Sequence, residues 1–140
     1  MSANVSEVKP LPSMQKGPIE RYHLVEWCAA ENDYYILHYD ERFARRMEFE
    51  APLIQGTYKL GLSGAYIAQV FGKDTRIRSI SMRYLRPDIE GSLLKLSAEL
   101  LAQERLDDGY LYRVVIRVCG TNGEVSAEAT AEVSTETAIA

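Results

Sequence analysis

The feature that most constrains the fold is a change from helical to strand patterning after residue 74. Four segments follow in which apolar and polar residues alternate or β-branched residues gather, at residues 80–85, 93–101, 110–119 and 124–134. Asp108-Gly109 separates the second segment from the third, and Thr121-Asn122-Gly123 separates the third from the fourth. Pairs of this kind are typical of tight hairpin turns. The pattern therefore predicts four antiparallel strands joined largely by short turns.

The residues before this sheet carry helical patterns. The strongest is residues 57–71, where apolar residues recur at helical spacing and Gly72 ends the run. Shorter helices are expected at residues 20–30 and 40–46, the latter with Asp40 as its N-cap. Helices segregated from an antiparallel sheet indicate an α+β domain, in which the long helix covers the inner face of a single curved sheet.

The long helix contains two glycines, Gly61 and Gly64, and Ser63 between them. Each glycine costs about 1 kcal/mol relative to alanine inside a helix. Small residues on an otherwise apolar helix predict that something packs very close to its backbone. The candidates are a neighbouring sheet, a second subunit or a ligand.

Length and composition indicate one domain. The chain has 140 residues, and residues 1–17, which include Pro10, Pro12 and Gly17, are expected to form an extended leader before a domain at 18–140. A net charge of −4 offers no basic field for nucleic acid. No run approaches the roughly 20 apolar residues of a membrane span, and no signal-peptide core is present. Cys28 and Cys119 are expected to be reduced thiols, and no close pairing of His and Cys suggests a metal site. We expect a cytoplasmic protein.

The most informative segment for function is residues 31–40, which separates two short helices. It places Asp33 five residues before His38, one of only two histidines. An acid and an imidazole that converge can hold and deprotonate a water molecule, because imidazole exchanges protons near neutral pH. The same spacing also arises when the aspartate only caps a turn and the histidine lies on the surface. Spacing alone leaves both interpretations open.

The segment resembles the signature of the MaoC-like hydratase/dehydratase family, Gly-Asp-x-Asn-Pro-(Leu/Ile/Val)-His with an alanine about six residues further on. Asp33, Leu37, His38 and Ala44 occupy the matching positions. The resemblance extends over residues 18–134. Its further parts are Pro18 to Arg21, the loop Pro52 to Gly56, the small residues Gly61 to Tyr66, and Arg83-Tyr84-Leu85-Arg86-Pro87 followed by Glu90-Gly91.

The resemblance implies a hotdog fold, a curved antiparallel sheet wrapped around a long helix. It also implies a homodimer, or a heteromer with another hotdog subunit. The implied substrate is an acyl thioester of coenzyme A or a carrier protein, to which water is added or from which it is removed at the 2,3 position, with no further cofactor. Asp33 and His38 would be the acid/base pair. The Gly56 N–H, immediately before the long helix, would stabilise the thioester oxyanion.

Four departures from the family pattern bear on the substrate. Asn32 replaces the motif glycine, Tyr35 its asparagine and Ile36 its proline, and Gln55 stands where the family often has histidine before Gly56. Candidate contacts to the substrate are Tyr35, Gln55, Ser63, Arg83 and Arg86. Arginines could attract the phosphates of a coenzyme. Arg42, Arg45 and Arg46 form a second basic cluster; we expect it to be a solvated helix face, although it would also attract a coenzyme phosphate.

Two other functions remain open at this point. Hotdog thioesterases usually carry a carboxylate on the central helix, whereas residues 57–71 contain neither Asp nor Glu. The chain could also be a non-catalytic partner subunit of a heteromeric dehydratase.

Overall fold

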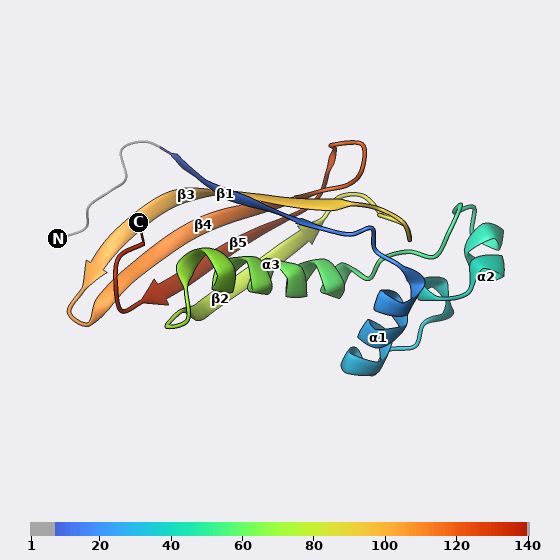
Figure 1. Ribbon diagram of the computed structural model, residues 1–140, viewed down its shortest axis with the longest axis horizontal. Coiled ribbons are helices and arrows are strands. Elements are labelled where there is room, and N and C mark those ends of the chain that lie inside the picture. The colour runs from blue at the N-terminus through green and yellow to red at the C-terminus, as the bar shows by residue number, and fades with distance from the viewer. Residues whose placement is uncertain (1–7, 140) are drawn as a thin grey trace.

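The architecture is a curved, five-stranded antiparallel sheet with one long helix along its concave face. The computed structural model describes residues 8–139. The strand order is β1-β3-β4-β5-β2, and Figure 1 shows α3 lying along the sheet while α1 and α2 extend beyond one end of it. The strands are β1 (Lys9–Lys16), β2 (Arg76–Tyr84), β3 (Leu94–Leu106), β4 (Gly109–Cys119) and β5 (Val125–Thr135). The helices are α1 (Arg21–Glu31), α2 (Glu41–Arg46) and α3 (Gly56–Phe71), with a single 3-10 turn at Ile36–His38. The predicted α+β architecture is confirmed.

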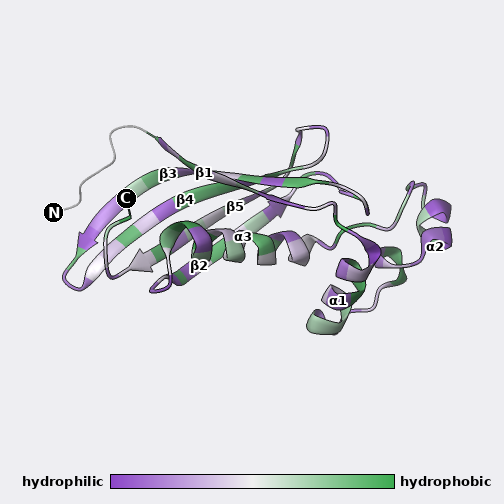
Figure 2. Ribbon diagram, in the orientation of Figure 1, coloured by the Kyte–Doolittle hydropathy of each residue, from purple (hydrophilic) through white to green (hydrophobic). Residues whose placement is uncertain are grey.

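The core lies between α3 and the inner face of β3, β4 and β5. Apolar side chains alternate along these strands, so every second one is fully buried, including Leu96, Val114 and Ala129. From the helix side, Tyr66, Ile67 and Phe71 pack against them. Figure 2 shows that α3, which lies along the sheet, is rich in apolar residues. Hairpin register is set as the sequence indicates, with Leu106 opposite Gly109 across the Asp107-Asp108 turn.

The expected leader contributes a fifth strand. Residues 1–7 lie outside the described range, but Lys9–Lys16 form β1, which pairs with β3. The expectation of four strands is therefore wrong by one. Pro10 and Pro12 suggest an irregular segment, yet β1 is an edge strand, where a missing N–H is tolerated. The strand is fixed by Leu11 and Met14 against the core.

The start of α2 and the end of α1 are both fixed by residues visible in the sequence. At the start of α2 the Asp40 carboxylate accepts a hydrogen bond from the Phe43 N–H at 3.0 Å, which confirms the N-cap. At the end of α1, Asn32 adopts a left-handed conformation with φ of 56°. After glycine, asparagine is the residue best suited to this conformation. The replacement of the motif glycine by Asn32 thus preserves the turn that leads to Asp33.

The close approach predicted at the small residues of α3 comes from α1. The indole of Trp27 lies over Gly61, with Cη2 2.7 Å from the place where a β-carbon would stand. Its Nε1 donates to Thr57 Oγ1 at 2.9 Å. At Gly64 the nearest such contact is Ile77 Cδ1 at 3.9 Å. The neighbour at Gly61 is thus a side chain of α1, which the sequence analysis did not name, while the neighbour at Gly64 belongs to the sheet strand β2.

Within residues 8–139, no helix has the length and apolar character needed to cross a membrane.

Candidate active site

A pocket of about 560 Å³ lies at the N-terminal end of α3. Three segments meet there: the turn after α1, the loop before α3, and the residues that follow β2. Its lining combines polar groups with an apolar wall made by Leu53, Ile54, Leu85 and Pro87. Asp33, His38 and Gly56, which are separate in the sequence, all line this pocket.

Asp33 is placed by the end of α1. Its own N–H donates to the Cys28 carbonyl at 3.0 Å, which extends the capping of the helix by one residue beyond Asn32. One carboxylate oxygen, Oδ1, accepts weakly from the Tyr35 N–H at 3.3 Å. The side chain is exposed toward the pocket. A carboxylate in this position retains free lone pairs that can accept from a water molecule.

His38 is oriented by the backbone of the opposite loop. Its Nδ1 lies 2.8 Å from the carbonyl oxygen of Leu53. Because a carbonyl can only accept, Nδ1 must carry the proton in this contact. The neutral imidazole then has an unprotonated Nε2, which is the form that can accept a proton. The bond therefore fixes the orientation of the ring and, in its neutral form, the tautomer.

Gly56 is the first residue of α3, so its N–H belongs to the helix end that has no intrahelical acceptors. Such N–H groups, together with the helix dipole, favour a developing negative charge. The phenol ring of Tyr84 lies against this glycine, with Cε1 2.8 Å from the position of an absent β-carbon. A side chain at position 56 would displace that ring.

Lys59, which lines the pocket, belongs to a buried ion pair. Lys59 Nζ lies 2.7 Å from Asp88 Oδ2, with side-chain exposures of only 3% and 9%. The same ammonium group donates to the Arg86 carbonyl at 3.2 Å. These bonds join the first turn of α3 to the segment after β2. The sequence analysis did not select Lys59, although it is the single charged residue within the predicted long helix, and that isolation is the signal that could have found it.

Gln55 lines the pocket, although only 3% of its surface is exposed. Its Nε2 donates to the Leu24 carbonyl at 2.8 Å and approaches Cys28 Sγ at 3.4 Å. These contacts tie the loop before α3 to α1. The orientation of the amide follows from the Leu24 carbonyl, which cannot donate. Within the described chain, Oε1 has no hydrogen-bond partner.

The other candidate substrate contacts are divided between the pocket and its surroundings. Arg86 lines the pocket and pairs with Glu124 at 2.6 Å. Tyr35 is 47% exposed and meets the His38 ring edge-on, with centroids 5.8 Å apart, but does not line the pocket. Arg83 also lies outside the lining, 3.6 Å from Glu128. Ser63 is buried and donates back to the Lys59 carbonyl at 3.0 Å.

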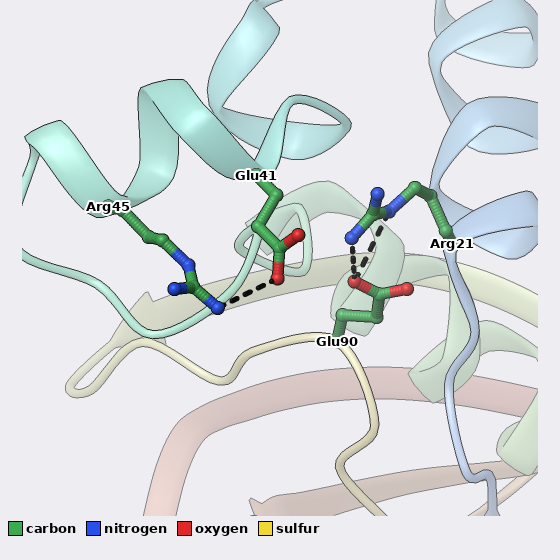
Figure 3. Close-up of polar contacts among 4 residues, drawn as sticks. All are labelled: Arg21, Glu41, Arg45 and Glu90. Carbon is green, nitrogen blue, oxygen red and sulfur yellow. Dashed lines mark hydrogen bonds and ion pairs between the residues drawn. The ribbon is translucent and has the colours of Figure 1, made fainter.

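Two ion pairs lie at the helices outside the pocket lining, as Figure 3 shows. Arg21 at the start of α1 donates from Nε and Nη2 to Glu90 Oε2, at 3.2 and 2.7 Å. Arg45 pairs with Glu41 within α2 at 3.2 Å. The bond to Glu90, with the nearby charges of Glu41 and Asp40, raises the pKa of Arg21. Within the α2 cluster suggested for a coenzyme phosphate, Arg45 is thus paired with Glu41.

Solved structures share this arrangement of sheet and helix. The (R)-hydratase from A. caviae involved in PHA biosynthesis matches with a TM-score of 0.82 at 23% identity, over 95% of this chain and 99% of the other. R-hydratase PhaJ1 from Pseudomonas aeruginosa gives 0.82 at 22% identity, over 94% and 90%. The ChsH1-ChsH2 complex from Mycobacterium tuberculosis gives 0.78 at 23% identity, over 94% and 99%. The molecule is a hotdog-fold protein.

The family follows from the sequence. A family model described as a MaoC like domain matches residues 7–119, and the chain belongs to this MaoC-like hydratase/dehydratase family. Curated protein sequences gave no match.

Proposed function

We propose that the chain is a hydro-lyase that adds water to, or removes it from, the 2,3 position of an acyl thioester carried by coenzyme A or a carrier protein. The observation that carries this proposal is the hydrogen bond between His38 Nδ1 and the Leu53 carbonyl. It leaves Nε2 as a base on the pocket that also contains Asp33 and the Gly56 N–H. Family membership and the (R)-hydratase neighbours support the reaction class.

In the hydration direction, Asp33 and His38 hold a water molecule between them. His38 Nε2 takes one proton as the water oxygen bonds to C3 of the enoyl thioester. The electron pair of the double bond moves toward the thioester carbonyl, and the Gly56 N–H stabilises the resulting enolate oxygen. The proton then passes from the pair to C2. Dehydration is the reverse sequence, and neither direction requires a cofactor.

The experiment is an assay of the purified protein with 2,3-enoyl and 3-hydroxyacyl thioesters of coenzyme A and of acyl carrier protein. We expect Asp33→Asn and His38→Ala each to lower kcat by about 10²- to 10⁴-fold, the range for general acid–base groups. Matched controls are Asp74→Asn, on an exposed turn, and His23→Ala, at the other histidine. Turnover that survives both site substitutions would reject the assignment of the pair.

A thiol reagent added to the same assay tests the thioesterase alternative. Hydration leaves the thioester intact, whereas a thioesterase releases free thiol. Within the described chain, α3 carries Lys59 as its one charged residue and no carboxylate. We therefore expect no thiol release.

We also propose that a second hotdog subunit pairs along β2. This strand is an edge of the sheet and its side chains are largely exposed, so its outer backbone groups are available for pairing. ChsH1-ChsH2 and HadBC, from Mycobacterium tuberculosis, are complexes of two different chains. Sedimentation of the purified chain distinguishes a homodimer from a monomer that needs a different partner for activity.

The proposed setting is the cytoplasm, without nucleic acid as a partner. Both cysteines are free thiols, and the net charge is −4.

A further inference from the structure

Tyr84 stands at the meeting point of β2 and α3. It is the last residue of β2, and its ring packs directly against Gly56, the first residue of α3. Cε1, Cζ and Cδ1 lie 2.8, 2.9 and 3.1 Å from the point where a β-carbon on Gly56 would stand. The side chain lines the pocket and is 50% exposed. It is therefore held beside the glycine while a ligand can still reach it.

The hydroxyl group of Tyr84 is what a phenylalanine at this position would lack. Cζ, which bears the hydroxyl, is among the ring atoms nearest to Gly56, so Oη lies one bond from the edge that faces the start of α3. No hydrogen bond joins Oη to another residue in the described range 8–139. Partial burial and the nearby charge of Glu31 raise the pKa of Tyr84. The phenol therefore stays protonated, and able to donate, up to higher pH than a free tyrosine.

We propose that Tyr84 Oη is a second hydrogen-bond donor to the thioester carbonyl oxygen, beside the Gly56 N–H. The inference rests on the proposed hydro-lyase function and adds a catalytic residue to it. A donor aimed at an oxygen that becomes negative stabilises the transition state more than the ground state. The proton remains on Oη throughout, since its role is to donate a hydrogen bond and not to transfer a proton.

The competing explanation is that the ring only packs against Gly56. Tyr84→Phe separates the two, because it keeps the ring and removes the hydroxyl. We expect kcat for an enoyl thioester to fall by about 10- to 100-fold, somewhat less than the loss of one oxyanion donor costs in other enzymes, because the Gly56 N–H remains. KM should change by less than about threefold, and the midpoint of urea unfolding should not move. Tyr110→Phe, on β4 outside this pocket, is the matched control and should leave kcat unchanged.

A second measurement reads the proposed contact without turnover. A coenzyme A thioester with a saturated acyl chain has no double bond to hydrate, so its carbonyl stretching frequency can be recorded in the bound state by infrared difference spectroscopy. Two donors should lower this frequency more than one. Binding to wild-type protein should therefore shift it further than binding to Tyr84→Phe.

The outcomes are distinct. If wild-type protein hydrates the thioester and Tyr84→Phe matches it in both kcat and carbonyl frequency, the Tyr84 proposal is overturned and the proposed function stands. A rise in kcat would also overturn it, because the hydroxyl would then be obstructing the site. If wild-type protein neither turns over nor binds a thioester, the proposed function fails, and the role of Tyr84 in it fails as well.

Discussion

The two ends of α3 belong to one continuous helix but have different surroundings: one lines a pocket and the other packs in the core. The first turn carries Gly56 and Lys59, which both line a pocket, and Lys59 also forms a buried ion pair with Asp88. The last two turns carry Tyr66, Ile67 and Phe71, which pack on the sheet. Within its 16 residues the helix thus makes polar contacts at its first turn and apolar contacts at its last two turns.

The difference shows how the fold supports a reactive site. Apolar burial by the distal turns fixes the helix on the sheet, so the proximal turn can hold a charge and a bare glycine without losing its position. Changes at the distal end should therefore alter stability alone. Changes at the proximal end should alter stability and chemistry together.

The largest effect is expected at Lys59. Lys59→Met leaves the Asp88 carboxylate buried without its partner, and breaking such a pair typically costs about 3–5 kcal/mol. We expect a loss of this size in urea unfolding. We also expect a fall in turnover, because the segment of Arg86 that lines the pocket loses its anchor.

The control for this prediction is the double variant Lys59→Met/Asp88→Asn. With no charge left to bury, most of the lost stability should return, since a neutral pair avoids the desolvation penalty. If the double variant is no more stable than the single one, burial of the unpaired charge is not the cause.

Ile67→Ala tests the distal end. Ile67 is fully buried, and truncation of such a residue costs about 2–5 kcal/mol through lost contacts and the remaining cavity. Urea unfolding should show that loss of stability. The kcat measured without urea should stay within about twofold of wild type. A large fall in kcat would show that the two ends are more tightly coupled than we infer.

Tyr66 gives the distal end a dependence on pH. Burial raises its pKa to about 12, whereas an unfolded tyrosine titrates near 10. Its contribution is complete below about pH 10 and is lost as the pH rises through the folded value, at about 1.4 kcal/mol per unit. Urea unfolding of wild type and Tyr66→Phe across pH 8–11.5 checks this.

At pH 8, Tyr66→Phe should be the less stable form by about 1 kcal/mol, because it lacks the 2.6 Å hydrogen bond to the Pro12 carbonyl. The difference should shrink and then reverse as the pH rises. Parallel pH profiles for the two proteins would contradict the assignment of this titration to Tyr66.

The smallest effects distinguish the glycines of α3. Gly64→Ala should stabilise the protein by about 1 kcal/mol, because alanine favours helix and the nearest contact is ordinary at 3.9 Å. Gly61→Ala gains the same propensity but meets the Trp27 ring, so it should be neutral or destabilising. Thermal unfolding of both variants measures the difference. Equal gains would show that the indole moves aside freely.

The fold was largely predictable because its elements have local signals. The β-branched residues within 110–119, the Asp-Gly turn and Gly72 after the long helix each indicate their structure without reference to a distant residue. β1 was missed because its two prolines argue against a strand, and only pairing with β3 overrides them. An edge position of this kind is a property of the whole sheet.

The site was predictable where it is contained in one segment. Asp33 and His38 lie five residues apart, the family resemblance singled them out, and the structure places both in the pocket lining. What orients His38 was not predictable, because the Leu53 carbonyl belongs to another loop, 15 residues further along the chain. Ser63 and Tyr35 illustrate the converse: their residue types suit a substrate contact, but tertiary packing turns them away from the pocket lining.

The bond from His38 to the backbone of Leu53 has a consequence for how this protein can vary. A carbonyl oxygen is present at every residue, so no particular side chain at position 53 is needed to keep the imidazole in this orientation. In a deep mutational scan, position 53 should accept aliphatic exchanges, while position 38 accepts almost none. The Leu53 carbonyl that orients His38 would therefore produce no intolerant position in such data. A search based on sequence variation alone would not find it.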